Sequence, residues 1–119
     1  MSKAATHTVH LHLSGEYDLA RRSELAAVLK PAKDADLAVI DMEAVTYMDS
    51  TALGCLIRLK KEMMLGGKSG NIHIVNLHPS LSRIFHICNL DKMFMVFERQ
   101  AVPQSASPAV AYGSERKVS

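Results

Sequence analysis

The chain has 119 residues, which is enough for one domain with a modest hydrophobic core. Its composition, with 48% hydrophobic and 22% charged residues, is that of an ordinary globular protein. The formal net charge of +2, without any run of more than two basic residues, gives no sign of a surface for nucleic acid or anionic membrane. No segment is apolar enough to span a membrane, and the N-terminus lacks the apolar core of a signal peptide. We therefore expect a cytoplasmic protein.

The first half of the chain predicts two strands with a helix between them. Residues 8–13 alternate between apolar and polar side chains, which is the pattern of a half-exposed strand. Residues 21–30 carry apolar side chains at helical spacing, and Pro31 ends this helix. Residues 37–40 are a short apolar run bounded by charge, which indicates a buried strand. Residues 42–47 are mixed in character, and we expect them to form a loop.

A longer helix is predicted over residues 51–64. Asp49 and Ser50 come directly before it, and both are favoured at a helix N-cap, where a side-chain oxygen accepts a hydrogen bond from an unpaired backbone N–H. The N-terminus of a helix also favours an anion, so Ser50 stands where a negative group would be stabilised. The apolar face of this helix is wide for one sheet to cover, which points to a weak homodimer. Its main members are Leu53, Leu56, Leu59 and Met63.

The second half predicts a further strand, helix and strand. A glycine-rich loop at residues 66–70 leads to a strand at 71–75. A helix over residues 79–89 and a strand at 93–97 complete the series, whose alternation favours an α/β domain with a largely parallel sheet. Residues 101–119 are small, polar and proline-containing, and we expect a disordered tail.

Two patterns that could bind ligands fit a structural explanation better. Gly67-Lys68-Ser69 matches the end of a phosphate-binding loop, but that motif needs a glycine where Glu62 stands, and it needs a strand before it and a helix after it. His10 and His12 share one face of the first strand and could bind a metal. No cysteine or carboxylate cluster completes such a set, so a solvated strand face is favoured.

Cysteine and serine are two further residue types that could be reactive. Cys55 and Cys88 fall on predicted apolar helix faces, so we expect reduced residues in the core. Ser50 follows a strand and precedes a helix, as a hydrolase nucleophile does. The flanking glycines of that motif are replaced by Met48 and Ala52, and nothing in the sequence places a base or an orienting acid. On these grounds we interpret Ser50 as a helix cap rather than as a nucleophile.

Residues 39–54 read V-I-D-M-E-A-V-T-Y-M-D-S-T-A-L-G. Here the chain resembles the STAS domain family, and within it the bacterial anti-sigma factor antagonists, which carry a V-x-x-M/I-D-S-S/T-G-L-G signature at the start of a helix. Residues 15–19 resemble the family's G-E-L-D segment. Residues 78–94 resemble another segment of the family, P-x-V-x-x-x-F followed by G-L-D-x-x-F. The resemblance implies a single STAS-like α/β domain over residues 1–100. Its mixed, mostly parallel sheet would have four to five strands, with amphipathic helices packed on it.

The resemblance also implies a function. In these antagonists the serine of the D-S motif is phosphorylated by a partner that is both anti-sigma factor and serine kinase. The unphosphorylated antagonist binds that partner and frees a sigma factor, and a separate phosphatase resets the switch. Carried over by position, the phosphoacceptor is Ser50, and Asp18, Asp49 and Thr51 belong to the partner-binding surface. We expect no enzymatic activity, no cofactor or metal, and no direct contact with nucleic acid or membrane.

The residues around Ser50 bear on this switch. Phosphorylation adds about −1.5 to −2 charges at pH 7, which a helix N-terminus tolerates. We therefore expect the phosphate to block the partner rather than refold the domain. Asp41, Glu43 and Asp49 are expected to make the surroundings of the serine acidic. Ala52 stands where many family members have glycine, and its methyl group is expected near the acceptor.

An alternative function comes from the same family. STAS subunits also accompany membrane transport complexes, such as ATP-driven lipid exporters, where the same helix docks on an ATPase subunit and the serine need not be modified. The acidic surroundings, the full D-S-T-x-L-G string and the G-E-Y-D segment favour the antagonist.

Overall fold

Within residues 7–99, the part of the chain described by the computed structural model, four strands pair in the order β1-β2-β3-β4 and all run parallel. The strands are β1 (Thr8–Tyr17), β2 (Leu37–Met48), β3 (Asn71–Leu77) and β4 (Met95–Glu98). The helices are α1 (Arg22–Leu29), α2 (Ser50–Leu65) and α3 (Pro79–Ile87), with short 3-10 helices at Leu19–Arg21, Lys30–Asp34 and Leu90–Lys92. The predicted α/β class and mostly parallel sheet are confirmed, and no antiparallel pair occurs among these residues.

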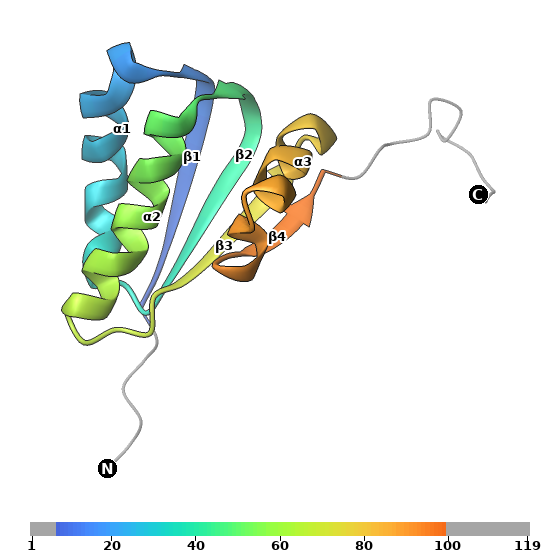
Figure 1. Ribbon diagram of the computed structural model, residues 1–119. Helices are drawn as coiled ribbons and strands as arrows, with labels where there is room; N and C mark the ends of the chain where they lie inside the picture. Colours follow the sequence, from blue (N-terminus) through green and yellow to red (C-terminus); the bar gives the residue numbers. More distant parts are fainter. Residues whose placement is uncertain (1–6, 100–119) are drawn as a thin grey trace, which may run out of the picture.

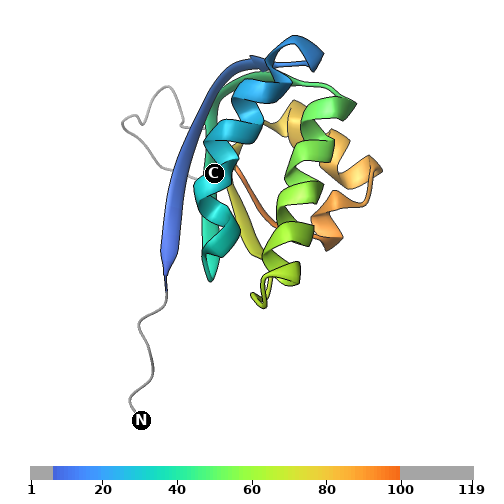
Figure 2. The ribbon, with the colours of Figure 1, turned by 90° about the vertical axis from the view of Figure 1, so that its left-hand side faces the viewer.

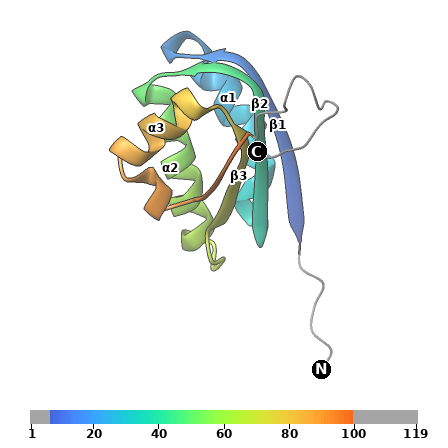
Figure 3. The same cartoon turned by 90° about the vertical axis from the view of Figure 1, so that its right-hand side faces the viewer.

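The three α-helices cover the same face of the sheet (Figures 1, 2 and 3). This follows from the strand order, because right-handed crossovers that always step in one direction place every connecting helix on one side. The opposite face carries His10, His12, Met95 and Phe97, all of which are exposed. The domain therefore has two layers, and α1 and α2 are neighbours above β1 and β2.

The core lies between the sheet and this helical layer. The apolar face of α2 packs into it, and Leu53, Leu56, Leu59 and Met63 are at most 7% exposed. That face is thus covered within the chain. Its width, which favoured a homodimer on sequence grounds, gives no support for one.

β2 is much longer than the sequence indicates, and the expected loop at residues 42–47 is wrong. β1 and β2 pair from Thr8 and Leu37 as far as Tyr17 and Met48, and β2 uses two more residues than β1 over this distance. The two register shifts interrupt the two-residue alternation of a strand, which is why residues 42–47 lack a strand-like pattern.

Both cysteines are free, but Cys88 is exposed rather than in the core. It follows the last residue of α3 and so lies beyond the stripe that buries Leu81 and Phe85. The next residue, Asn89, has a φ of +60°, the left-handed conformation common at a helix end.

Within the described residues, none of the helices has both the length and the apolar character needed to cross a membrane. The predicted disordered tail at residues 101–119 lies outside the described residues.

Candidate functional site

The carboxyl ends of β1 and β2 bring two predicted site residues to the same edge of the sheet. Tyr17 and Met48 are partners at the ends of these strands. Asp49, the residue that follows β2, donates its backbone N–H to the carbonyl oxygen of Tyr17 at 3.1 Å. Asp18 and Asp49 therefore occupy corresponding positions after two neighbouring strands. In open α/β sheets, ligands bind outside the carboxyl ends of the strands.

Asp49, not Ser50, is the N-cap of α2. Its Oδ1 accepts a hydrogen bond from the backbone N–H of Ala52 at 2.9 Å, and its carbonyl oxygen accepts from Leu53 at 3.0 Å. Ser50 is the first helical residue and is exposed. Because the cap is supplied by Asp49, the Ser50 hydroxyl has no hydrogen-bond partner among residues 7–99 and is available to react.

The first three residues of α2 differ in their exposure to solvent. Ser50 is exposed, Thr51 is half-buried, and Ala52 is only 1% exposed. Residues two apart on an α-helix point about 200° away from each other. The methyl group of Ala52 thus faces the core, and the expectation that it lies near the acceptor is wrong.

Asp18 also acts as a helix cap. Its Oδ1 accepts from the backbone N–H of Ala20 at 3.0 Å, and its carbonyl oxygen accepts from the N–H of Arg21 at 3.0 Å. One carboxylate oxygen is used in this turn, and the residue remains half-buried at the surface. The loop that presents Asp18 is thereby ordered.

Arg21 fixes the backbone at the end of β1, where the loop that carries Asp18 begins. Its Nη1 donates to the carbonyl oxygens of Ser14 at 3.0 Å and Glu16 at 2.9 Å, and its guanidinium carbon lies 4.2 Å from the centre of the Tyr17 ring. A side-chain hydrogen bond between Arg21 and Glu24 raises the pKa of the guanidinium and lowers the pKa of the carboxyl group. The G-E-Y-D segment is therefore held in place by a residue outside it.

The expected acidic surroundings of Ser50 are only partly present. Asp41 accepts from Asn76 Nδ2 at 3.2 Å and lies 3.4 Å from His12 Nδ1. It stands eight residues before Asp49 in an extended strand, a separation on the order of 20 Å. Asp41 is therefore wrong as a neighbour of the serine, and the acidic group beside Ser50 consists of Asp18 and Asp49.

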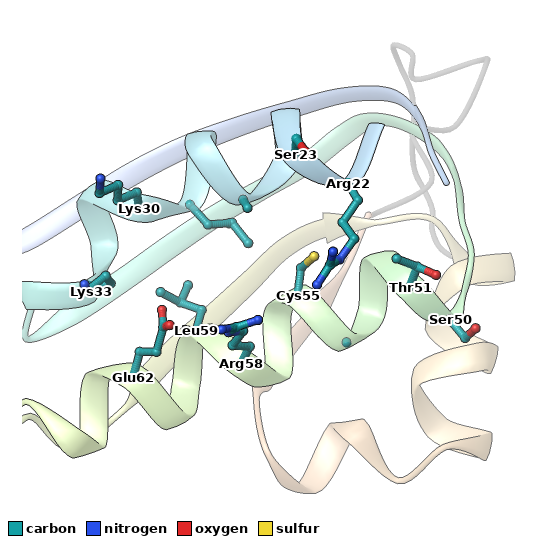
Figure 4. A pocket seen from close by; sticks show the side chains of 13 residues that line it. Arg22, Ser23, Lys30, Lys33, Ser50, Thr51, Cys55, Arg58, Leu59 and Glu62 are labelled. Carbon is teal, nitrogen blue, oxygen red and sulfur yellow. Dashed lines mark ion pairs between the residues drawn. The ribbon is translucent and has the colours of Figure 1, made fainter. Parts of the chain in front are cut away.

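A groove of about 640 Å³ runs between α1 and α2 and ends at Ser50 and Thr51. Figure 4 shows Arg22 reaching from α1 toward α2, with Arg58 on the facing side of α2. The sequence alone did not indicate this groove, although consecutive right-handed crossovers would have placed the two helices side by side.

The other candidate residues have structural settings. His10 and His12 are exposed on the open face of the sheet. Lys68, in the glycine-rich loop after α2, places its Nζ 3.3 Å from Asp36 Oδ1. Among residues 7–99 no three histidine, cysteine or acidic side chains are grouped so that they could hold a metal ion.

The sequence model of the STAS domain family matches residues 2–101. The chain belongs to the STAS domain family. A STAS-domain containing protein of Pseudomonas aeruginosa (strain UCBPP-PA14) is 34% identical over 58 residues, which are 49% of this chain and 55% of that protein. The chain thus spans about half the length of this curated relative in the match.

Solved structures include both antagonists and transporter domains. An anti-sigma factor antagonist from Mycobacterium paratuberculosis is 25% identical, with 80% of each chain covered and a TM-score of 0.66. The phosphorylated form of SpoIIAA, a Bacillus cell fate determinant, is 19% identical, with 89% of this chain and 93% of that one covered and a TM-score of 0.57. A sulfate transporter family protein from Wolinella succinogenes is 14% identical, with 77% of each chain covered and a TM-score of 0.62.

Proposed function

We propose that this protein is an anti-sigma factor antagonist. In its unphosphorylated form it binds an anti-sigma factor that is also a serine kinase, and this binding releases a sigma factor. Phosphorylation of Ser50 ends the interaction, and a separate phosphatase restores it. The observation that carries the proposal is the exposed Ser50 hydroxyl at the start of α2, left free because Asp49 supplies the cap.

The position of Ser50 suits a group that must change charge without unfolding the domain. A phosphate there would gain the favourable field of the helix N-terminus and the unpaired N–H groups of its first turn. The cap bond from Ala52 to Asp49 does not involve the serine hydroxyl and can persist. The folded state is therefore expected to tolerate the modification.

The phosphate is expected to weaken the binding of the partner. Asp49 and Thr51 flank Ser50 in the chain and Asp18 lies at the same edge of the sheet, and we assign all three to the contact with the anti-sigma factor. A dianion of about −1.5 to −2 charges beside two carboxylates repels, and sterically obstructs, a surface shaped for a neutral hydroxyl. The switch then works by blocking the interface. The chain itself performs no catalysis in this scheme, which would operate in the cytoplasm.

Two similarities support the antagonist. The Mycobacterium structure at 25% identity is named as an anti-sigma factor antagonist. SpoIIAA, which shares the fold, has been solved in a phosphorylated form, so this fold can carry a phosphate.

The alternative is an accessory subunit of a membrane lipid transporter complex. It is supported by the likeness of the fold to that of a sulfate transporter family protein. In such a subunit α2 would dock on an ATPase without modification of Ser50. The genes beside this one separate the two functions: a kinase-type anti-sigma factor with a sigma factor, or a permease with an ATPase.

Incubation with a candidate kinase–anti-sigma protein and ATP, followed by mass mapping, tests the proposed function. One phosphate is expected, on Ser50. It should be absent from Ser50→Ala and retained by Thr51→Ala, which removes the neighbouring hydroxyl. Phosphate on Thr51 or elsewhere would overturn the assignment.

A further inference from the structure

The groove between α1 and α2 is open because small residues form its floor. Ala26 of α1 and Gly54 of α2 both line it and are exposed. A Cβ built at Gly54 meets no atom within 4 Å outside its own helix and chain neighbours. The depression is thus an unfilled space between two helices rather than a gap covered by side chains.

The α2 wall of the groove is a single helical stripe. Thr51, Cys55, Arg58 and Glu62 recur at helical spacing along it. The eleven steps along the helix from Thr51 to Glu62 span roughly 16 Å, about three helical turns. Leu29 and Leu59 also line the groove, but both are buried and leave the exposed apolar surface to Ala26 and Gly54. The shape and floor therefore suit the apolar face of another helix.

Positive charge dominates the rim. Four lining residues are cationic and one, Glu62, is acidic, and the Glu62 carboxylate lies 3.4 Å from Arg58 Nε. The cationic residues are Arg22, Lys30, Lys33 and Arg58. The whole chain has a net charge of only +2, so this is a local concentration. Figure 4 shows Lys30 and Lys33 at the α1 side, away from the Ser50 end, and Arg22 and Arg58 nearer the middle.

We propose that the groove between α1 and α2 is a docking site for an amphipathic helix of a partner protein whose polar flanks are acidic. The apolar side of that helix lies over Ala26 and Gly54, and its carboxylates face the cationic rim. Charge complementarity of this kind sets orientation and partner choice. A protein helix fits better than a single-stranded nucleic acid, since the lining residues include no aromatic ring on which a base could stack.

Two synthetic helical peptides of about three turns test the proposal. They share length and leucine positions, and their polar flanks carry glutamate in one and lysine in the other. Each is titrated into the ¹⁵N-labelled full chain while amide signals are followed by NMR. The glutamate peptide is expected to shift the signals of Ala26, Gly54 and Arg58, and the lysine peptide is expected to leave them in place.

Two substitutions with matched controls locate the site. Gly54→Leu fills the groove and also favours the helix, so loss of binding cannot be ascribed to unfolding. It should weaken the glutamate peptide at least about tenfold. Lys61→Leu adds the same side chain at an exposed position of α2 outside the groove and should have little effect. Arg58→Glu should weaken binding, whereas Arg83→Glu on α3 should not.

Several results would overturn the proposal. They are no shift with the glutamate peptide, equal shifts with both peptides, shifts confined to the open face of the sheet, and unchanged affinity in Gly54→Leu. If a polyuridine oligonucleotide bound more tightly than the glutamate peptide and shifted the same amide signals, the groove would be assigned to nucleic acid instead.

Discussion

The backbone N–H of Asp49 donates a 3.1 Å hydrogen bond to the carbonyl oxygen of Tyr17. This bond joins the end of the G-E-Y-D segment to the start of the D-S-T motif, two segments that lie far apart in the sequence. Asp18 and Ser50 consequently belong to one surface. The family resemblance predicted that both motifs matter, and the bond places them at the same edge of the sheet.

Replacing Asp49 tests the assignment of the cap. Asp49→Ala removes the acceptor for the Ala52 N–H and should lower the free energy of unfolding by about 1 kcal/mol. Asp49→Asn keeps an acceptor and should lose little, while Ser50→Ala should leave stability nearly unchanged. Urea denaturation of the three variants gives the comparison. A larger loss in Ser50→Ala than in Asp49→Ala would mean that the serine is the cap.

Two glycines with similar φ angles test the role of Arg21. Gly15 has a φ of +83° and Gly67 a φ of +88°, so alanine at either position should cost about 1 kcal/mol. A Cβ at Gly15 would also lie 3.0 Å from Arg21 Nη1, whereas one at Gly67 meets nothing within 4 Å. Gly15→Ala should therefore be the more destabilising by urea denaturation. Equal losses of stability in the two variants would show that the contact with Arg21 does not constrain the backbone at Gly15.

The sequence predicted the order of elements and the parallel sheet well, because helical and strand periodicity are local properties. It failed at residues 42–47, where two extra residues in β2 hide the strand pattern. It placed Asp41 beside Ser50 for the same reason, since a loop would have folded back where an extended strand does not. Which of Asp49 and Ser50 is the cap also depends on backbone angles that composition does not determine. The groove was missed because it arises from the packing of two helices.

The Asp36 carboxylate ties three segments together and should make part of the stability depend on pH. The backbone N–H of His7 donates to it at 2.8 Å and Lys68 Nζ lies 3.3 Å away, and these contacts lower its pKa, the former more than the latter. A lowered folded-state pKa means that the stabilisation is present above the ordinary aspartate pKa of about 3.9 and fades as the pH falls below it.

Melting temperatures of Asp36→Asn and wild type check this dependence. The variant should melt lower at pH 7, and the difference should shrink below about pH 4. Asp34→Asn, at an exposed position nearby, serves as the control and should show a smaller effect at pH 7. A difference that stays constant from neutral to acid pH would mean that the ionised carboxylate is not the stabilising species.

Charge at Ser50 is expected to block a partner without disturbing the fold. Isothermal titration of the cognate anti-sigma factor with Ser50→Ala, Ser50→Asp and wild type tests it, alongside circular dichroism of each. Ser80→Asp, at an exposed serine near the start of α3, is the matched control. We predict that Ser50→Ala and Ser80→Asp bind like wild type, while Ser50→Asp keeps its spectrum and binds at least about tenfold more weakly. Wild-type affinity in a folded Ser50→Asp would contradict the account.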